Sequence, residues 1–265
     1  MEYIRNKGLY LLESLEAHGM QTFTIEDARG FLHTSRNNVL AIVGNLGRKK
    51  RIISLTKGLY SLWHPSERTW GIHPFPIIDS LMRYRQSAYY VGLLSAADYY
   101  GACEQKPQVL QIVIPKQLKF RKAKDLALSF HVQKSFPTIG INLEKTTDGH
   151  VALSSPELTA LDIFYFEFTC AGFRNVCQVI YNLKDRFNEK DLEKIITYYA
   201  HPSSIQKLGF IMEYYQVHKN IISVLENWAR GKKLSPIALT PTHPKKGHVH
   251  SLWKVVKNSN IEIDS

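Results

Sequence analysis

The sequence predicts an α+β fold in two parts, and three patterns support that prediction. Residues 3–63 combine helical hydrophobic spacing with two short β-rich runs. A stretch rich in proline and polar residues follows, from His64 to Pro76. Beyond it come helical segments, then several strand-like runs, then helical segments again. Because helices and strands are grouped rather than strictly alternating, the order is typical of an α+β domain.

The first two helices are marked by their ends. Residues 3–18 carry apolar side chains at helical spacing, and Gly19 ends that helix. Thr24, with Asp27 three residues later, resembles a capping box in which Asp replaces Glu. It opens a short helix that we expect to end near Leu32.

A third helix and a hairpin follow. Thr34 or Ser35 caps the helix. Runs 51–55 and 59–63 are short strands around a turn at residues 56–58, which contains glycine. We expect these side chains to form the buried stripe of the helix: Val39, Leu40, Ile42, Val43 and Leu46. Two short helices followed by a hairpin predict a winged helix-turn-helix, which commonly places its second helix in the DNA major groove.

The second part has its own order of elements. We expect helices at 79–85 and 94–100, and a further helix from Pro156 capped by Ser154 or Ser155. Breaks in the helical region that runs to Trp228 are predicted at Gly172, Asn188, Pro202 and about Asn220. The expected strands are 109–114, 119–121, 127–132, 139–146 and 151–153, with extended segments at 237–239 and 252–256.

These elements predict three sections of chain. Residues 1–65 form the winged helix-turn-helix domain, residues 66–76 a linker, and residues 77–265 a mixed α+β domain. At 265 residues the chain can hold one large or two ordinary domains, which agrees with this division.

Composition limits the partners and the compartment. A formal net charge of +11 favours contact with polyanions, with nucleic acid ahead of anionic membranes. No apolar run is long enough to serve as a signal peptide or a membrane span. The three cysteines are an odd number without metal-binding spacing. We therefore expect a reduced, cytoplasmic protein without a membrane partner.

The predicted recognition helix presents suitable side chains to DNA. Asn pairs with adenine and Arg with guanine in the major groove, so the first turn would read bases. The cations at the exit of the helix would meet phosphates, and the wing tip a neighbouring phosphate or the minor groove. The candidate DNA-binding residues are Ser35, Arg36, Asn37, Asn38, Asn45, Arg48, Lys49, Lys50, Arg51 and Lys57.

Two alternatives remain open for these cations. The asparagines could simply be solvated, with the cation run balancing the helix C-terminus. A second acid-free cluster could be either a solvated face or another polyanion surface. That cluster comprises Lys116, Lys119, Arg121, Lys122 and Lys124.

Signals for catalysis are weak. The sequence has no nucleophile elbow, phosphate-binding loop or zinc-protease motif. His248 and His250 could share one face of a strand, but no third zinc ligand is identifiable. Cys170 and Cys177 are interpreted as packed thiols. We predict no enzyme activity, no cofactor and no metal.

Several stretches, taken in order, resemble one protein family. The run from Arg51 to Tyr60 is similar to a wing of the form basic residue, apolar run, Lys-Gly-x-Tyr. Later similar stretches are Tyr90–Gly101, Gln105–Pro115, Ser155–Asp162, Lys207–Phe210 and Trp253–Asn258. On this shared order, the chain resembles AbiEi-type antitoxins, the transcriptional-regulator half of bacterial type IV toxin–antitoxin and phage abortive-infection modules. One departure is that the family often has Lys near the position of Thr159 or Ala160.

The resemblance implies a function for each domain. The first would bind inverted repeats in its own promoter and repress the operon. The second would neutralise a nucleotidyltransferase-like toxin, directly or functionally, without requiring a tight blocking complex.

Two other functions compete with this one. The first is a stand-alone winged-helix transcription factor whose second domain senses a ligand or a protein. The second is a nuclease or nucleotidyltransferase guided to DNA by the winged helix.

Overall fold

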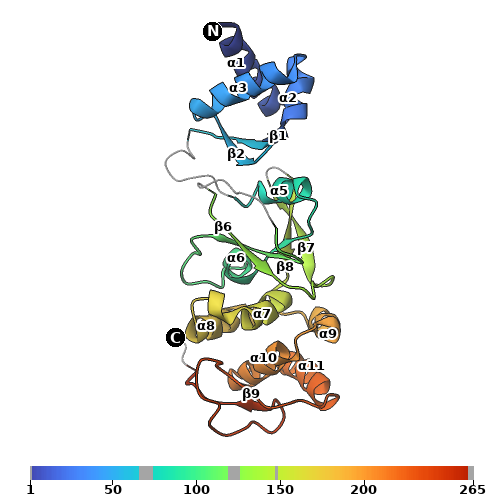
Figure 1. Ribbon diagram of the computed structural model, residues 1–265. Coiled ribbons are helices and arrows are strands. Elements are labelled where there is room, and N and C mark those ends of the chain that lie inside the picture. Colours follow the sequence, from blue (N-terminus) through green and yellow to red (C-terminus); the bar gives the residue numbers. More distant parts are fainter. Residues whose placement is uncertain (1, 66–73, 119–125, 147–148, 262–265) are drawn as a thin grey trace. The chain divides into compact units, whose positions relative to one another are not determined.

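The computed structural model describes residues 2–65, 74–118, 126–146 and 149–261, and it confirms the mixed α+β composition (Figure 1). Its contacts group the chain into two compact units. The first comprises the described residues within 1–89, 114–132 and 143–151, and the second those within 90–113, 133–142 and 152–265. Most of the predicted linker lies outside the described residues, so the predicted domain boundaries stay predictions.

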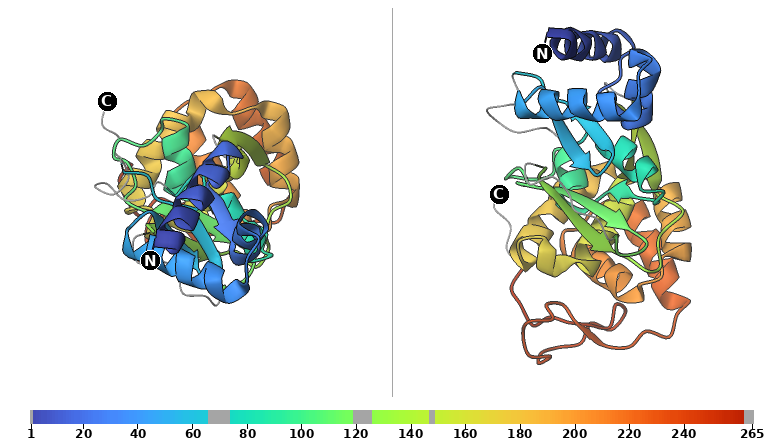
Figure 2. Two further views of the ribbon diagram at one scale, coloured as in Figure 1. Left: turned by 90° about the horizontal axis from the view of Figure 1, so that it is seen from above. Right: turned by 45° about the horizontal axis from the view of Figure 1, so that its top comes forward.

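The N-terminal elements follow the predicted order. They are α1 (Glu2–Ala17), β1 (Thr22–Thr24), α2 (Ile25–Leu32), α3 (Arg36–Arg48), β2 (Ile52–Thr56) and β3 (Leu59–Leu62). The three strands form an antiparallel sheet in the order β1–β3–β2, and α3 packs against β2 (Figure 2). Strand β1 was not predicted, because three residues are too few to show an alternating pattern. This arrangement is compatible with a winged helix-turn-helix.

Side-chain caps set the starts of α2 and α3. The predicted capping box is confirmed: the Thr24 hydroxyl accepts a hydrogen bond from the Asp27 N–H, and the Asp27 carboxylate accepts one from the Thr24 N–H at 2.7 Å. Ser35, rather than Thr34, caps α3 and accepts from the Asn38 N–H at 3.3 Å.

An apolar core joins the N-terminal helices and the small sheet, and it includes Leu11, Phe23 and Ile42. The predicted stripe of α3 is buried except at Leu40, which is 44% exposed. That part of the prediction was wrong. Leu40 lies about 100° around the helix from Val39, so it falls outside the inward-facing stripe.

The next elements along the chain include the strands of a larger sheet. They are α5 (Ile78–Tyr84), β4 (Tyr90–Val91), α6 (Leu93–Tyr99), β5 (Leu110–Ile114), β6 (Leu128–Val132), β7 (Ile141–Thr146) and β8 (Gly149–Ser154). The strand order is β6–β5–β4–β8–β7, with β4 antiparallel to β5 and parallel to β8. Strand β4 was not predicted, and the strand expected at 119–121 lies outside the described residues.

The remaining elements are mainly helical. They are α7 (Pro156–Tyr165), η1 (Glu167–Thr169), α8 (Phe173–Leu183), η2 (Lys184–Arg186), α9 (Glu189–Tyr198), α10 (Pro202–Tyr214), α11 (Lys219–Arg230), β9 (Ile237–Ala238) and β10 (Val255–Val256). Three of the predicted breaks are confirmed, since Gly172 precedes α8, Asn188 caps α9 and Pro202 begins α10. The break expected at about Asn220 falls instead at residues 215–218, and Asn220 lies inside α11. Within the described residues, no helix is long and apolar enough to cross a membrane.

Helix α7 is buried over most of its circumference, and its polar residues meet different neighbours. Residues 157–164 are all buried. The Glu157 carboxylate accepts hydrogen bonds from the Ser155 hydroxyl and from the Asn188 N–H, each at 2.7 Å. The Thr159 hydroxyl lies 2.6 Å from that of Ser154. These bonds fix the start of α7 and hold the N-terminal cap of α9 to it. They also give the buried polar groups of α7 the hydrogen-bond partners that buried polar groups need.

Helix α10 meets the C-terminal segment through a glycine. A methyl group added at Gly209 would overlap the indole ring of Trp253, which is fully buried. The indole N–H of Trp253 also donates to the Glu213 carboxylate. Gly209 therefore lets a large aromatic ring lie directly against the helix backbone.

This packing generates a prediction about stability. Gly209→Ala should lower the free energy of unfolding by about 1–3 kcal/mol, because the added methyl group overpacks a filled core. Urea denaturation measures the change. Gly30→Ala in α2 is the matched control, because no atom lies within 4 Å of its added methyl group. Equal stability of Gly209→Ala and wild type would contradict this reading of the contact.

Candidate functional site

The predicted base-reading side chains lie at the start of α3. Ser35, Arg36, Asn37 and Asn38 are all exposed. Two of them make local hydrogen bonds, since Ser35 caps the helix and the Asn38 amide donates to the Thr34 hydroxyl at 3.1 Å. The first turn of the helix thus combines a cap with exposed polar side chains.

Arg36 has an ionic partner on the preceding helix. One Glu26 oxygen accepts from Arg36 at 2.7 Å, and the other accepts from Arg29 at 2.6 Å. The side chains of Arg36 and Glu26 are 60% and 59% exposed, so this pair contributes at most about 1 kcal/mol. The guanidinium group can therefore exchange Glu26 for another acceptor at little cost.

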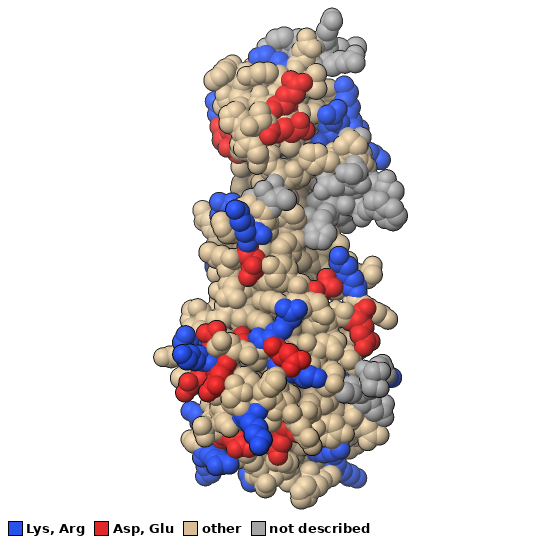
Figure 3. Space-filling model, turned by 180° about the vertical axis from the view of Figure 1, so that it is seen from behind, with Lys and Arg blue, Asp and Glu red and all other residues tan. Residues whose placement is uncertain are grey.

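Four exposed cations follow at the exit of α3: Arg48, Lys49, Lys50 and Arg51. The chain turns sharply here, with φ of 52° at Lys50 and a hydrogen bond from the Arg51 N–H to the Leu46 carbonyl at 3.0 Å. Cations at a helix C-terminus are stabilised by the helix dipole. In the view of Figure 3, Lys and Arg side chains gather along one edge of the N-terminal part of the chain.

The wing tip is held by an aromatic side chain of the same unit. Lys57 is exposed at the turn between β2 and β3, and Gly58 has φ of +89°, where glycine is favoured. The Tyr84 hydroxyl donates to the Lys57 carbonyl at 3.1 Å. Asn45, the remaining candidate on α3, is half-buried.

The second basic cluster is described only in part. Lys116 is exposed. The other four residues lie outside the described residues: Lys119, Arg121, Lys122 and Lys124.

A buried carboxyl group is the centre of a polar cluster in the second unit. Asp162, on α7, is fully buried and accepts hydrogen bonds from the hydroxyls of Tyr90 at 2.6 Å and Tyr199 at 2.8 Å. Burial raises the pKa of Asp162 to about 7, and the hydrogen bonds from Tyr90 and Tyr199 oppose that rise. Burial also raises the pKa of both tyrosines well above the ordinary value.

Asp162 can be hydrogen-bonded to Tyr90 whether its carboxyl group is ionised or protonated. The Tyr90 hydroxyl has one proton but two acceptors within reach, the Asp162 carboxylate and the Gln133 side-chain oxygen at 3.0 Å. When Asp162 is ionised, that proton bonds the carboxylate. When Asp162 is protonated, it can donate to Tyr90 while Tyr90 donates to Gln133.

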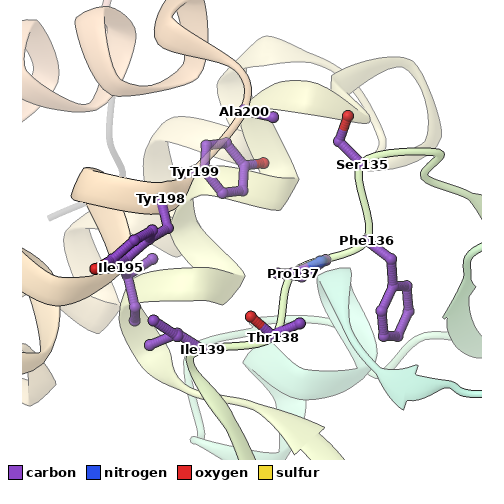
Figure 4. Close-up of a pocket in the computed structure, with 9 residues that line it drawn as sticks. All are labelled: Ser135, Phe136, Pro137, Thr138, Ile139, Ile195, Tyr198, Tyr199 and Ala200. Carbon is purple, nitrogen blue, oxygen red and sulfur yellow. The ribbon is translucent and has the colours of Figure 1, made fainter.

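A small cavity of about 160 Å³ adjoins this cluster through Tyr199. Figure 4 shows it between the segment from Ser135 to Ile139 and the end of α9, which contributes Ile195 and Tyr198 and is followed by Tyr199. Most of its lining is apolar or aromatic.

A buried ion pair lines a second cavity in this unit. The Lys207 ammonium, on α10, lies 2.5 Å from the Glu167 carboxylate, and the side chains are each 7% exposed. Both residues line a cavity of about 350 Å³. Burying two charges is costly unless they are paired, as they are here.

Two of the described cysteines are buried thiols. Cys170 and Cys177 are buried, as predicted, and burial raises the pKa of each thiol to about 12. Neither is a reactive thiolate at neutral pH. Among the described residues, no group of three His, Cys, Asp or Glu side chains could hold a metal ion.

Sequence reasoning did not single out the buried polar groups. Tyr90, Asp162 and Lys207 lie within stretches that carry the family resemblance, so a signal for them was present. Glu167 and Tyr199 lie in no such stretch, and only the fold brings them to their partners.

Comparisons with known proteins identify a matching family model and a solved structure of similar fold. Residues 90–214 match the family model of the AbiEi antitoxin C-terminal domain, which confirms the resemblance seen in the sequence. The crystal structure of the RV2827C protein from Mycobacterium tuberculosis is similar to this chain, with a TM-score of 0.70 and 14% identity. That match covers 94% of this chain and 90% of the other, and it shows a shared fold. No curated protein matches the chain.

The buried carboxyl group predicts a pH dependence of stability. Unfolded aspartate loses its proton near its ordinary pKa of 3.8, whereas folded Asp162 keeps it up to about pH 7. The free energy of unfolding should therefore fall as pH rises between these values. Between pH 5 and pH 8, the free energy of unfolding of Asp162→Asn should fall by about 2–3 kcal/mol less than that of wild type, because the variant lacks the titrating carboxyl group.

Urea denaturation at the two pH values measures the difference. Asp191→Asn is the matched control, because Asp191 is an exposed aspartate of the same unit. An unchanged pH profile in Asp162→Asn would show that Asp162 does not titrate as described.

Proposed function

We propose that this chain is the DNA-binding autorepressor and antitoxin of a type IV toxin–antitoxin system, because residues 90–214 match the family model of the AbiEi antitoxin C-terminal domain. The antitoxin role rests on the family match. The repressor role rests on the N-terminal helices, whose order and hairpin are compatible with a winged helix-turn-helix.

The observation that carries DNA binding is the division of side chains along α3. Its first turn exposes Arg36 and Asn37, which have the chemistry to read guanine and adenine in the major groove. Its exit exposes four cations from Arg48 to Arg51. Cations of this kind bind phosphates and supply affinity that does not depend on sequence.

The wing supports the same surface. Lys57 is exposed at the tip of the hairpin, where it would contact a phosphate or the minor groove. The hydrogen bond from Tyr84 to the Lys57 carbonyl fixes the backbone that carries this side chain. Two copies bound to one inverted repeat would sit about 34–36 Å apart, or a multiple of that, on one face of the duplex.

The ion pair between Arg36 and Glu26 fits this proposal. It orients the guanidinium group in the free protein, and its exposure lets the group leave Glu26 when a guanine or phosphate approaches. The Glu26 carboxylate also disfavours phosphate close to the first turn. Arg36 would therefore contribute more to selecting a base than to general affinity.

A partner toxin completes the proposal. The family resemblance implies a nucleotidyltransferase-like toxin, neutralised directly or functionally. Co-expression of the full chain with such a toxin, if its gene adjoins this one, tests the antitoxin role. Rescue of growth by the Arg36→Ala variant would separate neutralisation from operator binding, whereas failure of the wild-type chain to rescue would reject the antitoxin role.

A gel-shift assay on the DNA upstream of this gene, against random DNA of equal length, tests the repressor role. Arg36→Ala should weaken operator binding by about 1–3 kcal/mol and relax the preference at one base position. Arg29→Ala is the matched control, because Arg29 shares Glu26 but lies on α2. Equal losses on operator and random DNA in Arg36→Ala would reject a base-reading role.

A salt series on the same DNAs tests the phosphate contacts. Lys49→Ala should lower affinity on every sequence and reduce the slope of log affinity against log salt by about one, since one fewer counterion is released. A slope equal to that of wild type would mean that Lys49 touches no phosphate.

A further inference from the structure

The cavity beside the buried ion pair has the size of a small-molecule site. Its volume is about 350 Å³, within the range of about 300–1,000 Å³ that ligand pockets occupy. Three parts of the second unit line it: the end of α7 with η1, the first half of α10, and the segment that carries β9. No part of the proposed DNA-binding surface contributes to it.

The charged group in this cavity has unused bonding capacity. Lys207 is only 5% exposed, yet it lines the cavity. An ammonium group has three N–H donors, and among the described residues Glu167 is its one hydrogen-bond partner. Unused N–H donors of a buried cation favour a ligand that brings acceptor oxygens.

A second cation stands at the same cavity. Lys245 is exposed, and its ammonium group donates to the Pro236 carbonyl, which also belongs to the lining. With Lys207 and Lys245 against Glu167, the lining carries a net charge of +1. An anionic group is the complement of such a lining.

Exposed aromatic rings accompany the two cations. The Phe168 side chain is 70% exposed and lines the cavity, as does Tyr165, which is 38% exposed. The Tyr165 ring stacks on His201 with 3.9 Å between ring centres. Aromatic faces beside cations are the means by which proteins bind bases and the phosphates attached to them.

We propose that this cavity binds a nucleotide, with the base against Phe168 and the phosphates at Lys207 and Lys245. An uncharged apolar ligand would leave the donors of Lys207 unused, and a bare phosphate ion would leave Phe168 in water. A nucleotide satisfies both features at once. This proposal does not depend on the DNA-binding role of the first unit.

Calorimetric titration of the full chain with the four common nucleoside triphosphates tests it. At least one should bind saturably with a Kd below about 1 mM. The corresponding nucleoside and inorganic phosphate separate the two halves of the ligand, and each should bind at least about tenfold more weakly. Absence of binding by all four triphosphates would overturn the proposal.

Two pairs of exposed positions locate the site. Phe168→Ala should weaken binding about fivefold or more, since stacking on one ring contributes a factor of that size. Lys245→Ala should weaken it by a similar factor, because a charge-assisted hydrogen bond to phosphate is lost. The matched controls are Tyr198→Ala, an aromatic side chain that is 74% exposed and lines the other cavity, and Lys246→Ala, the neighbouring exposed lysine. Both controls should bind as wild type does.

Each remaining outcome has a defined meaning. Wild-type affinity in both Phe168→Ala and Lys245→Ala would place the nucleotide elsewhere and overturn the site. Stronger binding of a short peptide with Phe and Glu than of any nucleotide would overturn the ligand class. Retention of nucleotide binding by Arg36→Ala, with operator binding weakened, would show that this site and the proposed DNA surface are separate.

Discussion

The packing of the second unit depends on hydrogen bonds and an ion pair to the carboxyl groups carried by, or next to, the buried helix α7. Helix α7 is enclosed by its neighbours, yet it carries Glu157 and Asp162, and Glu167 follows it directly. Each carboxyl group reaches residues outside α7: Glu157 the N-terminal cap of α9, Asp162 strand β4 and the C-terminal cap of α9, and Glu167 helix α10. Because an unpaired buried carboxylate is costly, these bonds fix where the surrounding elements lie.

The first unit uses the opposite arrangement, with an apolar core and polar groups outside. Core side chains such as Val39 and Leu46 fill one side of α3, so its other side is free to carry Arg36 and the exit cations. Exposed charges cost little to rearrange. A surface of this kind suits reversible binding of DNA, whereas the buried charges of the second unit suit fixed geometry and a defined cavity.

Stretches that resemble the antitoxin family prove to be points where elements meet. Tyr90 and Asp162 hydrogen-bond to each other, Lys207 pairs with Glu167, and Gly209 admits the ring of Trp253. Most of these residues hold the domain together and contact no solvent. Lys207 is different because it also lines a cavity, and this is where a structural requirement and a proposed ligand site coincide.

Local patterns in the sequence determined most of the elements, because caps, glycine stops and hydrophobic periods act within a few residues. They predicted the Thr24 capping box, the hairpin around Gly58 and the exposed cations after α3. Tertiary structure alone decided the rest. Strands β1 and β4 exist only through their partners, and Tyr199 meets Asp162 across 37 residues. Such contacts join groups far apart in the chain, and no local spacing encodes them.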